Sequence, residues 1–191
     1  MSDNQSGRKP KPKPTDPEAI VCAARAALDK AAPGLGAFHM NSCVKCGLCG
    51  ESCHIYITDP VPENLPGVKA SRVISFFRRY HTIMGKVFPK LVGARDITPE
   101  ALDELVEVVY GRCTCCGRCG INCSIGLDVG TVMRIGRKML ADAGKVPPNL
   151  QAVVDNQIND GNQMSVTPKE LSETASWIAE DLKMEDRKSV V

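Results

Sequence analysis

Apolar residues recur every three or four positions in five stretches of the chain, which is the spacing of one face of an α-helix. These stretches are residues 15–34, 70–86, 98–111, 128–144 and 167–182. No run alternates apolar and polar residues in the manner of a half-buried β-strand. The pattern therefore predicts an all-α chain in which loops join the helices.

Threonines are placed to cap the N-termini of three of these helices. Thr15 and Thr167 each precede a glutamate by three residues, which is a capping-box pattern. Thr98 precedes a proline, a residue that favours the first helical turn. Gly144 follows the fourth stretch and is expected to end that helix, because glycine adopts the left-handed conformation of a C-terminal cap.

Several side chains on these helices are expected to form a hydrophobic core. The apolar face of the 70–86 helix consists of Ala70, Val73, Ile74, Phe77 and Met84. Met133 and Met139 are interpreted as core side chains rather than ligands, because methionine fills irregular gaps well. Cys22 has no cysteine near it in sequence and is expected to be a small buried side chain.

Composition divides the chain into three parts. Residues 1–14 are rich in lysine and proline, cannot bury apolar area, and are expected to form a disordered arm. Residues 15–147 contain all ten cysteines and are predicted to form the main helical domain. Residues 148–191 are predicted to be a helical extension that could dock on a partner.

The charge balance argues against several classes of partner. The chain has 24 basic and 22 acidic residues and a net charge of +2, so it has no global field that would attract nucleic acid. No stretch approaches the roughly 18 apolar residues of a membrane span, and the N-terminus lacks the apolar segment of an export signal. We therefore expect a cytoplasmic protein with no transmembrane segment.

The cysteines carry the chemistry of this sequence. Ten cysteines accompany only eight aromatic residues, which suggests that a bound inorganic group contributes to the core. In the reducing cytosol, metal or redox-cofactor ligation is a more common use of cysteine than a disulfide framework. Eight of the ten lie in two blocks, "CVKCGLCGESC" and "CTCCGRCGINC", with the common spacing C-x2-C-x2-C-x3-C.

This spacing is typical of ferredoxins with two 4Fe-4S clusters, in which the fourth cysteine of each block binds the other cluster. That rule predicts a crossed assignment of the ligands. The first cluster would take Cys43, Cys46, Cys49 and Cys123. The second cluster would take Cys113, Cys116, Cys119 and Cys53. Because neither block could then hold its cluster alone, cluster assembly and folding are expected to be coupled.

Zinc is the alternative metal, since four thiolates also suit a closed zinc site. Zinc sites usually pair two separated C-x2-C knuckles, so the longer runs found here favour iron–sulfur clusters. The ferredoxin run normally ends in Cys-Pro, whereas His54 and Ser124 follow the blocks in this chain. His54 could donate a hydrogen bond to a cluster sulfur, or it could be an ordinary loop residue.

Cys115 is an additional thiol in the second block. Its counterpart in the first block is Lys45, so the common ligand pattern does not need it. We expect a spectator thiol near the cluster, with a substitute ligand as the alternative. Cys115, Cys116 and Gly117 also spell "CCG", but a CCG catalytic domain needs a further cysteine pair downstream, and no cysteine follows Cys123.

The 59 residues between the blocks, 54–112, carry two of the helical patterns, which is typical of an α-helical ferredoxin domain. With "GLDVGTVMRIGRKMLADAGKVP" after the second block, the chain over roughly residues 35–150 resembles the family of C-type subunits of heterodisulfide reductases. The resemblance implies an electron-transfer subunit with two 4Fe-4S clusters. Its partners would be a flavin-containing subunit of the A type and a catalytic CCG-domain subunit of the B type, acting on thiol, disulfide or other sulfur compounds.

Two other functions remain open at this stage. The chain could be the iron–sulfur subunit of a flavin-dependent dehydrogenase for an organic acid or glycerol phosphate, or a structural protein whose metals are not redox-active. No set of acid and base residues indicates catalysis within the chain. Two candidate docking surfaces are the C-terminal helix around Trp177 and a basic helix that could equally be a solvated face. The basic positions are Arg72, Arg78, Arg79, His81 and Lys86.

Overall fold

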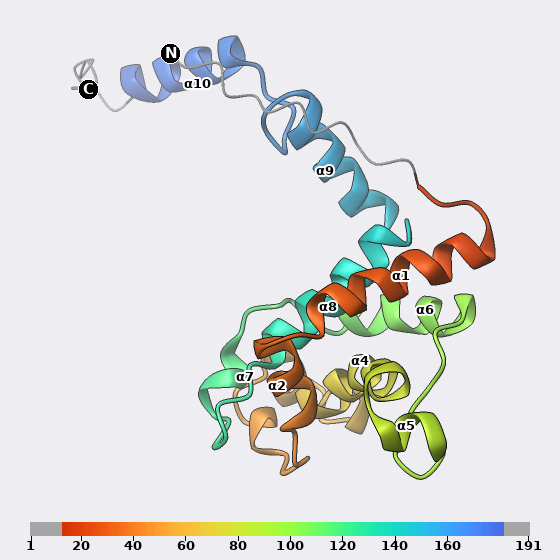
Figure 1. The fold of residues 1–191 in the computed structure, drawn as a ribbon. Helices are drawn as coiled ribbons and strands as arrows, with labels where there is room; N and C mark the ends of the chain where they lie inside the picture. The colour runs from red at the N-terminus through yellow and green to blue at the C-terminus, as the bar shows by residue number, and fades with distance from the viewer. Residues whose placement is uncertain (1–12, 182–191) are drawn as a thin grey trace. The chain divides into compact units, whose positions relative to one another are not determined.

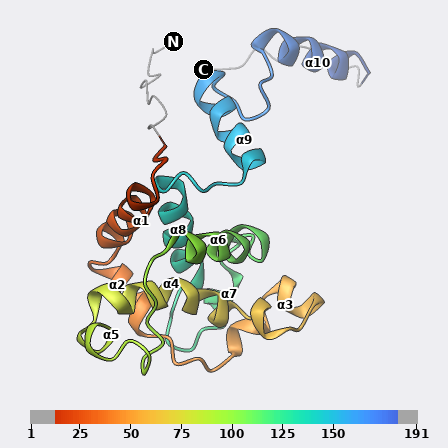
Figure 2. The same ribbon diagram turned by 90° about the vertical axis from the view of Figure 1, so that its right-hand side faces the viewer.

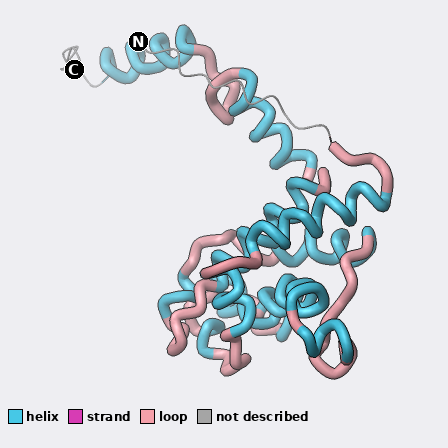
Figure 3. Tube along the Cα trace, viewed as in Figure 1, coloured by secondary structure: helices cyan, strands magenta, loops and turns pink. Residues whose placement is uncertain are grey.

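The computed structural model describes residues 13–181, and all regular structure in that range is helical (Figure 3). The predicted all-α class is confirmed for this part of the chain. The predicted N-terminal arm lies almost entirely outside the described residues. Within residues 13–181, no helix has both the length and the apolar character needed to cross a membrane.

Contacts divide the chain into two units, one of which comprises residues 13–147. Its longer helices are α1 (Pro17–Ala31), α2 (Leu35–Asn41), α4 (Pro66–His81), α6 (Pro99–Val106) and α8 (Val129–Asp142). Its shorter helical segments are η1 (Leu48–Gly50), α3 (His54–Thr58), η2 (Pro62–Asn64), α5 (Ile83–Val87), the π-helical turn η3 (Glu107–Gly111) and α7 (Arg118–Ile121).

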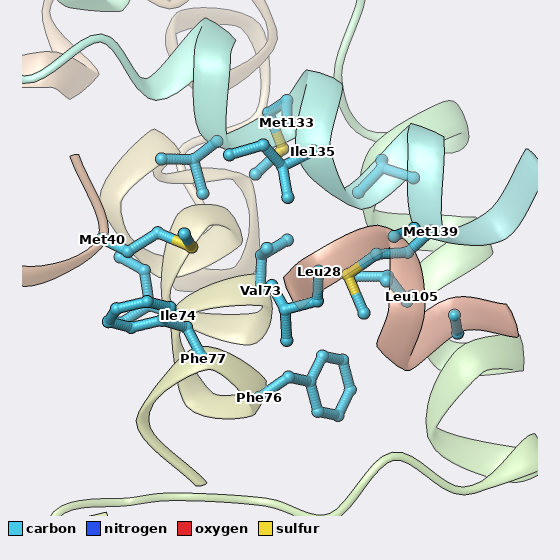
Figure 4. Close-up of a cluster of buried hydrophobic side chains, with 14 of the residues drawn as sticks. Leu28, Met40, Val73, Ile74, Phe76, Phe77, Leu105, Met133, Ile135 and Met139 are labelled. Carbon is cyan, nitrogen blue, oxygen red and sulfur yellow. The ribbon is translucent and has the colours of Figure 1, made fainter. Parts of the chain in front are cut away.

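Helix α8 is the central element of this unit. It lies beside α1 (Figures 1 and 2) and also packs on α4 and α6. Leu28 of α1, Val73 of α4 and Met139 of α8 meet between these helices (Figure 4), and none of the three is exposed to solvent. Met133 is likewise fully buried, so the prediction that both methionines are core side chains is confirmed. Burial of apolar side chains is thus what holds the two cysteine-bearing halves together.

Two of the three predicted N-terminal caps are present. The Thr98 hydroxyl accepts a hydrogen bond from the Ala101 N–H at 3.2 Å. In the second unit, Thr167 and Glu170 form a reciprocal capping box, with bonds of 2.7 Å from the Thr167 N–H and 3.2 Å from the Glu170 N–H. Gly144 has φ +72°, as expected for the residue that ends α8.

The predicted cap at Thr15 is wrong. Helix α1 begins at Pro17, its N-cap is Asp16, and no side chain caps this end. Proline favours the first helical position because its φ is already helical and its missing N–H needs no partner. This preference shifts the start of the helix by one residue, so that Glu18 is no longer in the position that a capping box with Thr15 requires.

Two other expectations about burial are also wrong. The helix predicted over 70–86 is interrupted at Thr82, whose hydroxyl accepts a hydrogen bond from the Gly85 N–H at 3.0 Å and starts α5. Met84 therefore leaves the apolar face of α4 and is 47% exposed. Cys22 is also exposed, because it lies about half a helical turn from Ala24, on the outer side of α1.

The other unit includes residues 148–191, in which α9 (Pro148–Asn159) and α10 (Pro168–Asp181) are described. Helix α9 was not recognised from the periodicity of the sequence. Neither helix buries a side chain within the described residues. The apolar face predicted for α10 is accordingly exposed, including Trp177 at 75%.

Candidate metal centre

The two cysteine blocks adopt the same backbone conformation. Lys45 and Cys115, the matching residues before the second cysteine of each block, have φ of 57° and 60°. Gly47 and Gly117, directly after that cysteine, have φ of 89° and 77°. Left-handed backbone at a residue other than glycine is uncommon and mildly strained, so its presence at both positions indicates that the repeated spacing imposes one loop shape.

A short helical turn follows each loop and carries the third cysteine. These turns are η1 after Gly47 and α7 after Gly117. Matching hydrogen bonds close the two turns, from the Cys53 N–H to Gly50 at 3.1 Å and from the Cys123 N–H to Gly120 at 3.3 Å. The fourth cysteine of each block therefore leaves its turn in an equivalent direction.

Each fourth cysteine lies with the first three cysteines of the other block. The first hollow, at the N-terminus of α4, is lined by Cys43, Cys46, Cys49 and Cys123. The second hollow, at the N-terminus of α8, is lined by Cys113, Cys116, Cys119 and Cys53, together with Cys115. The structure thus brings the eight candidate ligands into two groups of four, in the same crossed combination that the spacing predicts.

Apolar side chains form much of the walls of both hollows. Leu65, Leu127 and Val129 line the first, and Ile55, Val129 and Met133 line the second. Gly67 keeps the first turn of α4 close to the first block, since a Cβ at this position would lie 3.6 Å from the Cys49 Sγ. Such walls restrict the access of water to whatever the thiols hold.

The set of donors fits iron–sulfur clusters, in which each iron takes one protein thiolate. A single zinc ion would require its four sulfurs to converge at about 2.3 Å from one point. Among residues 13–181, no group of three or more histidine, cysteine or acidic side chains is arranged to hold a single ion. The thiols instead surround a space, with one thiol from the opposite block in each set.

Burial and mutual proximity make several of these thiols hard to ionise. Burial, followed by the negative charge of nearby Cys113 and Cys49 thiolates, raises the pKa of Cys119 to about 12. Burial also raises the pKa of Cys49 and of Cys113. The thiolate form of these groups therefore needs compensating positive charge, which bound iron would supply.

Cys116 behaves differently from its neighbours. It is exposed, and a hydrogen bond from the Arg118 backbone N–H is the main cause that lowers the pKa of its thiol. This makes Cys116 the ligand candidate in the second block that ionises most readily relative to Cys113 and Cys119.

The two cysteines that cross between blocks accept different hydrogen bonds. The Cys123 Sγ accepts one from the Leu127 backbone N–H at 3.3 Å. The Cys53 Sγ lies 3.7 Å from the Nζ of Lys69, a residue of α4 that is only 2% exposed. Lys69 was not recognised from the sequence, although its place four residues before the core position Val73 was a usable signal.

The two residues of open role both lie at the second hollow. The Cys115 Sγ is 3.8 Å from the Gly130 carbonyl oxygen, and its backbone N–H donates to the Cys113 Sγ at 3.4 Å. His54 begins α3, and its Nε2 lies 3.5 Å from the Thr114 hydroxyl. A spectator role for Cys115 and a sulfur-directed role for His54 remain predictions.

Three of the basic side chains considered for docking bond within their own unit. Arg79 forms an ion pair with Asp96 at 2.7 Å, and His81 lies 3.0 Å from Asp29. Arg78 donates to the Val92 carbonyl at 3.1 Å. These contacts use much of the charge on which a docking role for this helix would depend.

Comparison with known proteins gives a consistent picture. No protein-family model matches the chain, and no solved structure matches it significantly. The chain is 33% identical over 129 residues to the Hdr-like menaquinol oxidoreductase iron-sulfur subunit 2 of Archaeoglobus fulgidus, which covers 68% of this chain and 23% of that protein. A corresponding iron-sulfur subunit of Archaeoglobus profundus is 33% identical over 127 residues, or 66% of this chain and 23% of that protein.

A second kind of relative is the D-type subunit of the dihydromethanophenazine:CoB–CoM heterodisulfide reductase of Methanosarcina barkeri. It is 26% identical over 152 residues, which cover 80% of this chain and 36% of that protein. The chain thus spans between about a quarter and a third of the length of the curated relatives that it matches. On these matches and the repeated cysteine blocks, the chain belongs to the heterodisulfide-reductase-like family of iron–sulfur proteins.

Proposed function

We propose that this chain is an electron-transfer subunit that binds two 4Fe-4S clusters and works in a heterodisulfide-reductase-like complex. The observation that carries the proposal is the pair of hollows, each lined by three thiols of one block and one thiol of the other. Residues 15–147 would form the α-helical two-cluster ferredoxin domain. When bound, such clusters accept and release single electrons.

The chain's own residues favour this use in three ways. Four thiols at each hollow provide one ligand for every iron of a cluster. The apolar walls limit water, which is one of the factors that set a cluster's reduction potential. Val129 is 2% exposed and lines both hollows, so the two sites border the same side chain and an electron would have only a short distance to travel between them.

The partners and the substrate are proposed as classes. The names of the relatives join heterodisulfide reductase and menaquinol oxidoreductase activities to iron–sulfur subunits. We infer that the chain relays electrons between a flavin-containing subunit and a CCG-domain subunit acting on thiol, disulfide or other sulfur compounds. Anaerobic co-purification tests this inference, and recovery of a different flavoprotein dehydrogenase would favour the alternative electron-transfer role.

The cluster content is tested on anaerobically reconstituted protein. We expect about eight irons and eight sulfides per chain, and paramagnetic signals after reduction with dithionite. A colourless, zinc-loaded protein would instead support the structural role and refute the proposal.

Paired cysteine variants test the crossed assignment. Cys46→Ser and Cys123→Ser are expected to disturb one paramagnetic signal, and Cys116→Ser and Cys53→Ser to disturb the other. Cys115→Ser is the matched control beside Cys116, and it should leave both clusters intact. If Cys123→Ser disturbed the same signal as Cys116→Ser, each cluster would belong to one block and the crossing would be wrong.

A further inference from the structure

Lys69 is a buried cation directed at one of the proposed ligands. It lies in the second turn of α4, is 2% exposed, and donates to the Arg112 carbonyl at 2.6 Å and toward the Cys53 Sγ at 3.7 Å. Lysine is almost never fully buried unless it is paired. Among the described residues, no carboxylate forms an ion pair with it. The thiol group of the second hollow is therefore the nearest counter-charge.

We propose that Lys69 raises the reduction potential of the cluster at the second hollow above that of the cluster at the first. This inference rests on the proposed function. One-electron reduction adds one negative charge to the cluster and its thiolates, and a nearby cation stabilises that charge. The effect is large in a buried site, because little solvent screens the interaction.

The corresponding position in the other half of the domain has no cation. Lys69 stands two residues after Gly67 at the start of α4, and Val132 stands two residues after Gly130 at the start of α8. Val132 is fully buried and apolar. The Cys123 Sγ accepts a hydrogen bond only from a neutral backbone N–H, whereas that from Lys69 to Cys53 is charge-assisted and hence stronger.

The two sites are therefore alike in their thiols and backbone but differ in charge. Within one chain, the second cluster would hold an electron in preference to the first. Electrons that enter at the first site would then pass to the second, which gives the relay a direction that the repeated cysteine pattern alone does not contain.

A purely structural role is the competing explanation, because Lys69 also binds the carbonyl of Arg112, the residue before Cys113. The two roles predict different results for neutral and charged replacements. Lys69→Gln removes the charge and retains a donor, whereas Lys69→Arg retains the charge. Arg72→Gln is the matched control, since Arg72 is a more exposed cation about one turn further along the same helix.

The test is a redox titration of the reconstituted chain, followed by paramagnetic resonance. The signal that Cys53→Ser alters identifies the second cluster, and the signal that Cys123→Ser alters identifies the first. In Lys69→Gln, we expect the equilibrium constant for reduction of the second cluster to fall by about tenfold, which is about 59 mV for a one-electron couple. The first cluster, Lys69→Arg and Arg72→Gln should stay close to wild type.

Three results would overturn the inference while leaving the two-cluster function intact. One is a Lys69→Gln protein that holds both clusters at unchanged potentials. Another is an equal shift of both clusters. The third needs no variant at Lys69: in the wild type, the Cys123-dependent signal would have the higher potential. A wild-type chain that binds no iron–sulfur cluster would instead refute the proposed function.

Discussion

Gly136 is the position at which the packing of the domain can be tested most directly. It lies in α8 where this helix packs on α4 and on the η3 turn. A Cβ at Gly136 would lie 2.9 Å from the Val73 Cγ2 and 3.1 Å from the Val109 Cγ1. Both valines are fully buried and, being β-branched, have little freedom to change rotamer. Gly136→Ala must therefore push α8 away from the elements that lead to the two cysteine blocks.

The expected cost follows from two opposing effects. Overpacking a dense core costs about 1–3 kcal/mol, while replacing glycine by alanine inside a helix recovers about 0.5–1 kcal/mol. The net destabilisation is thus about 0.5–2 kcal/mol. For a chain of this size, this lowers the melting temperature by roughly 1–8 °C.

The assay is thermal unfolding of the reconstituted protein, followed by helical circular dichroism at one fixed scan rate, because cluster loss makes the transition irreversible. Val73→Ala provides the second arm of a double-mutant cycle. It creates a cavity in the wild type, but in Gly136→Ala it removes the obstructing methyl groups, so the double variant should be more stable than the sum of the single effects implies. A Gly136→Ala protein as stable as wild type, or strictly additive effects, would refute the packing argument.

Two further predictions concern a helix cap and thiol reactivity. Thr98→Ala removes the hydrogen bond to Ala101 and should cost about 1 kcal/mol, seen as a melting temperature lower by about 2–4 °C; Thr15→Ala is the control, and an equal loss there would contradict the assigned caps. In metal-free protein at mildly alkaline pH, iodoacetamide should label Cys116 before Cys119, because the thiolate reacts and the pKa of Cys116 is lowered while that of Cys119 is raised to about 12. Peptide mass spectrometry measures both rates, and their ratio should shrink as pH rises; labelling of Cys119 first would contradict the burial of that thiol.

Local sequence predicted the local features of this chain well. The caps at Thr98 and Thr167 and the helix end at Gly144 depend on residues a few positions apart, so their signals can be read directly. The errors arose where two local signals competed. Pro17 took precedence over Thr15 as the start of α1, and Thr82 began a new helix inside a continuous apolar pattern.

Burial was less predictable than helix position, because it depends on which side of a helix meets a neighbour. Cys22 was expected to be buried by residue type, yet the side of α1 that packs on α8 is the side of Ala24 and Leu28. Lys69 shows the opposite case. A charged residue near the start of a helix reads as solvent-exposed, and only the approach of the second block to α4 makes it a buried neighbour of Cys53.

The sequence by itself determined the helical class, the two repeated loops and the identity of eight candidate ligands, because each depends on spacing within one short segment. The tertiary structure decided which thiols lie together, since Cys123 joins Cys43, Cys46 and Cys49 only when α4 and α8 pack with their N-termini toward opposite blocks. It also decided the electrostatic difference between the two hollows. Two loops with the same spacing and backbone acquire different surroundings because one faces a helix that carries Lys69 and the other a helix that carries Val132.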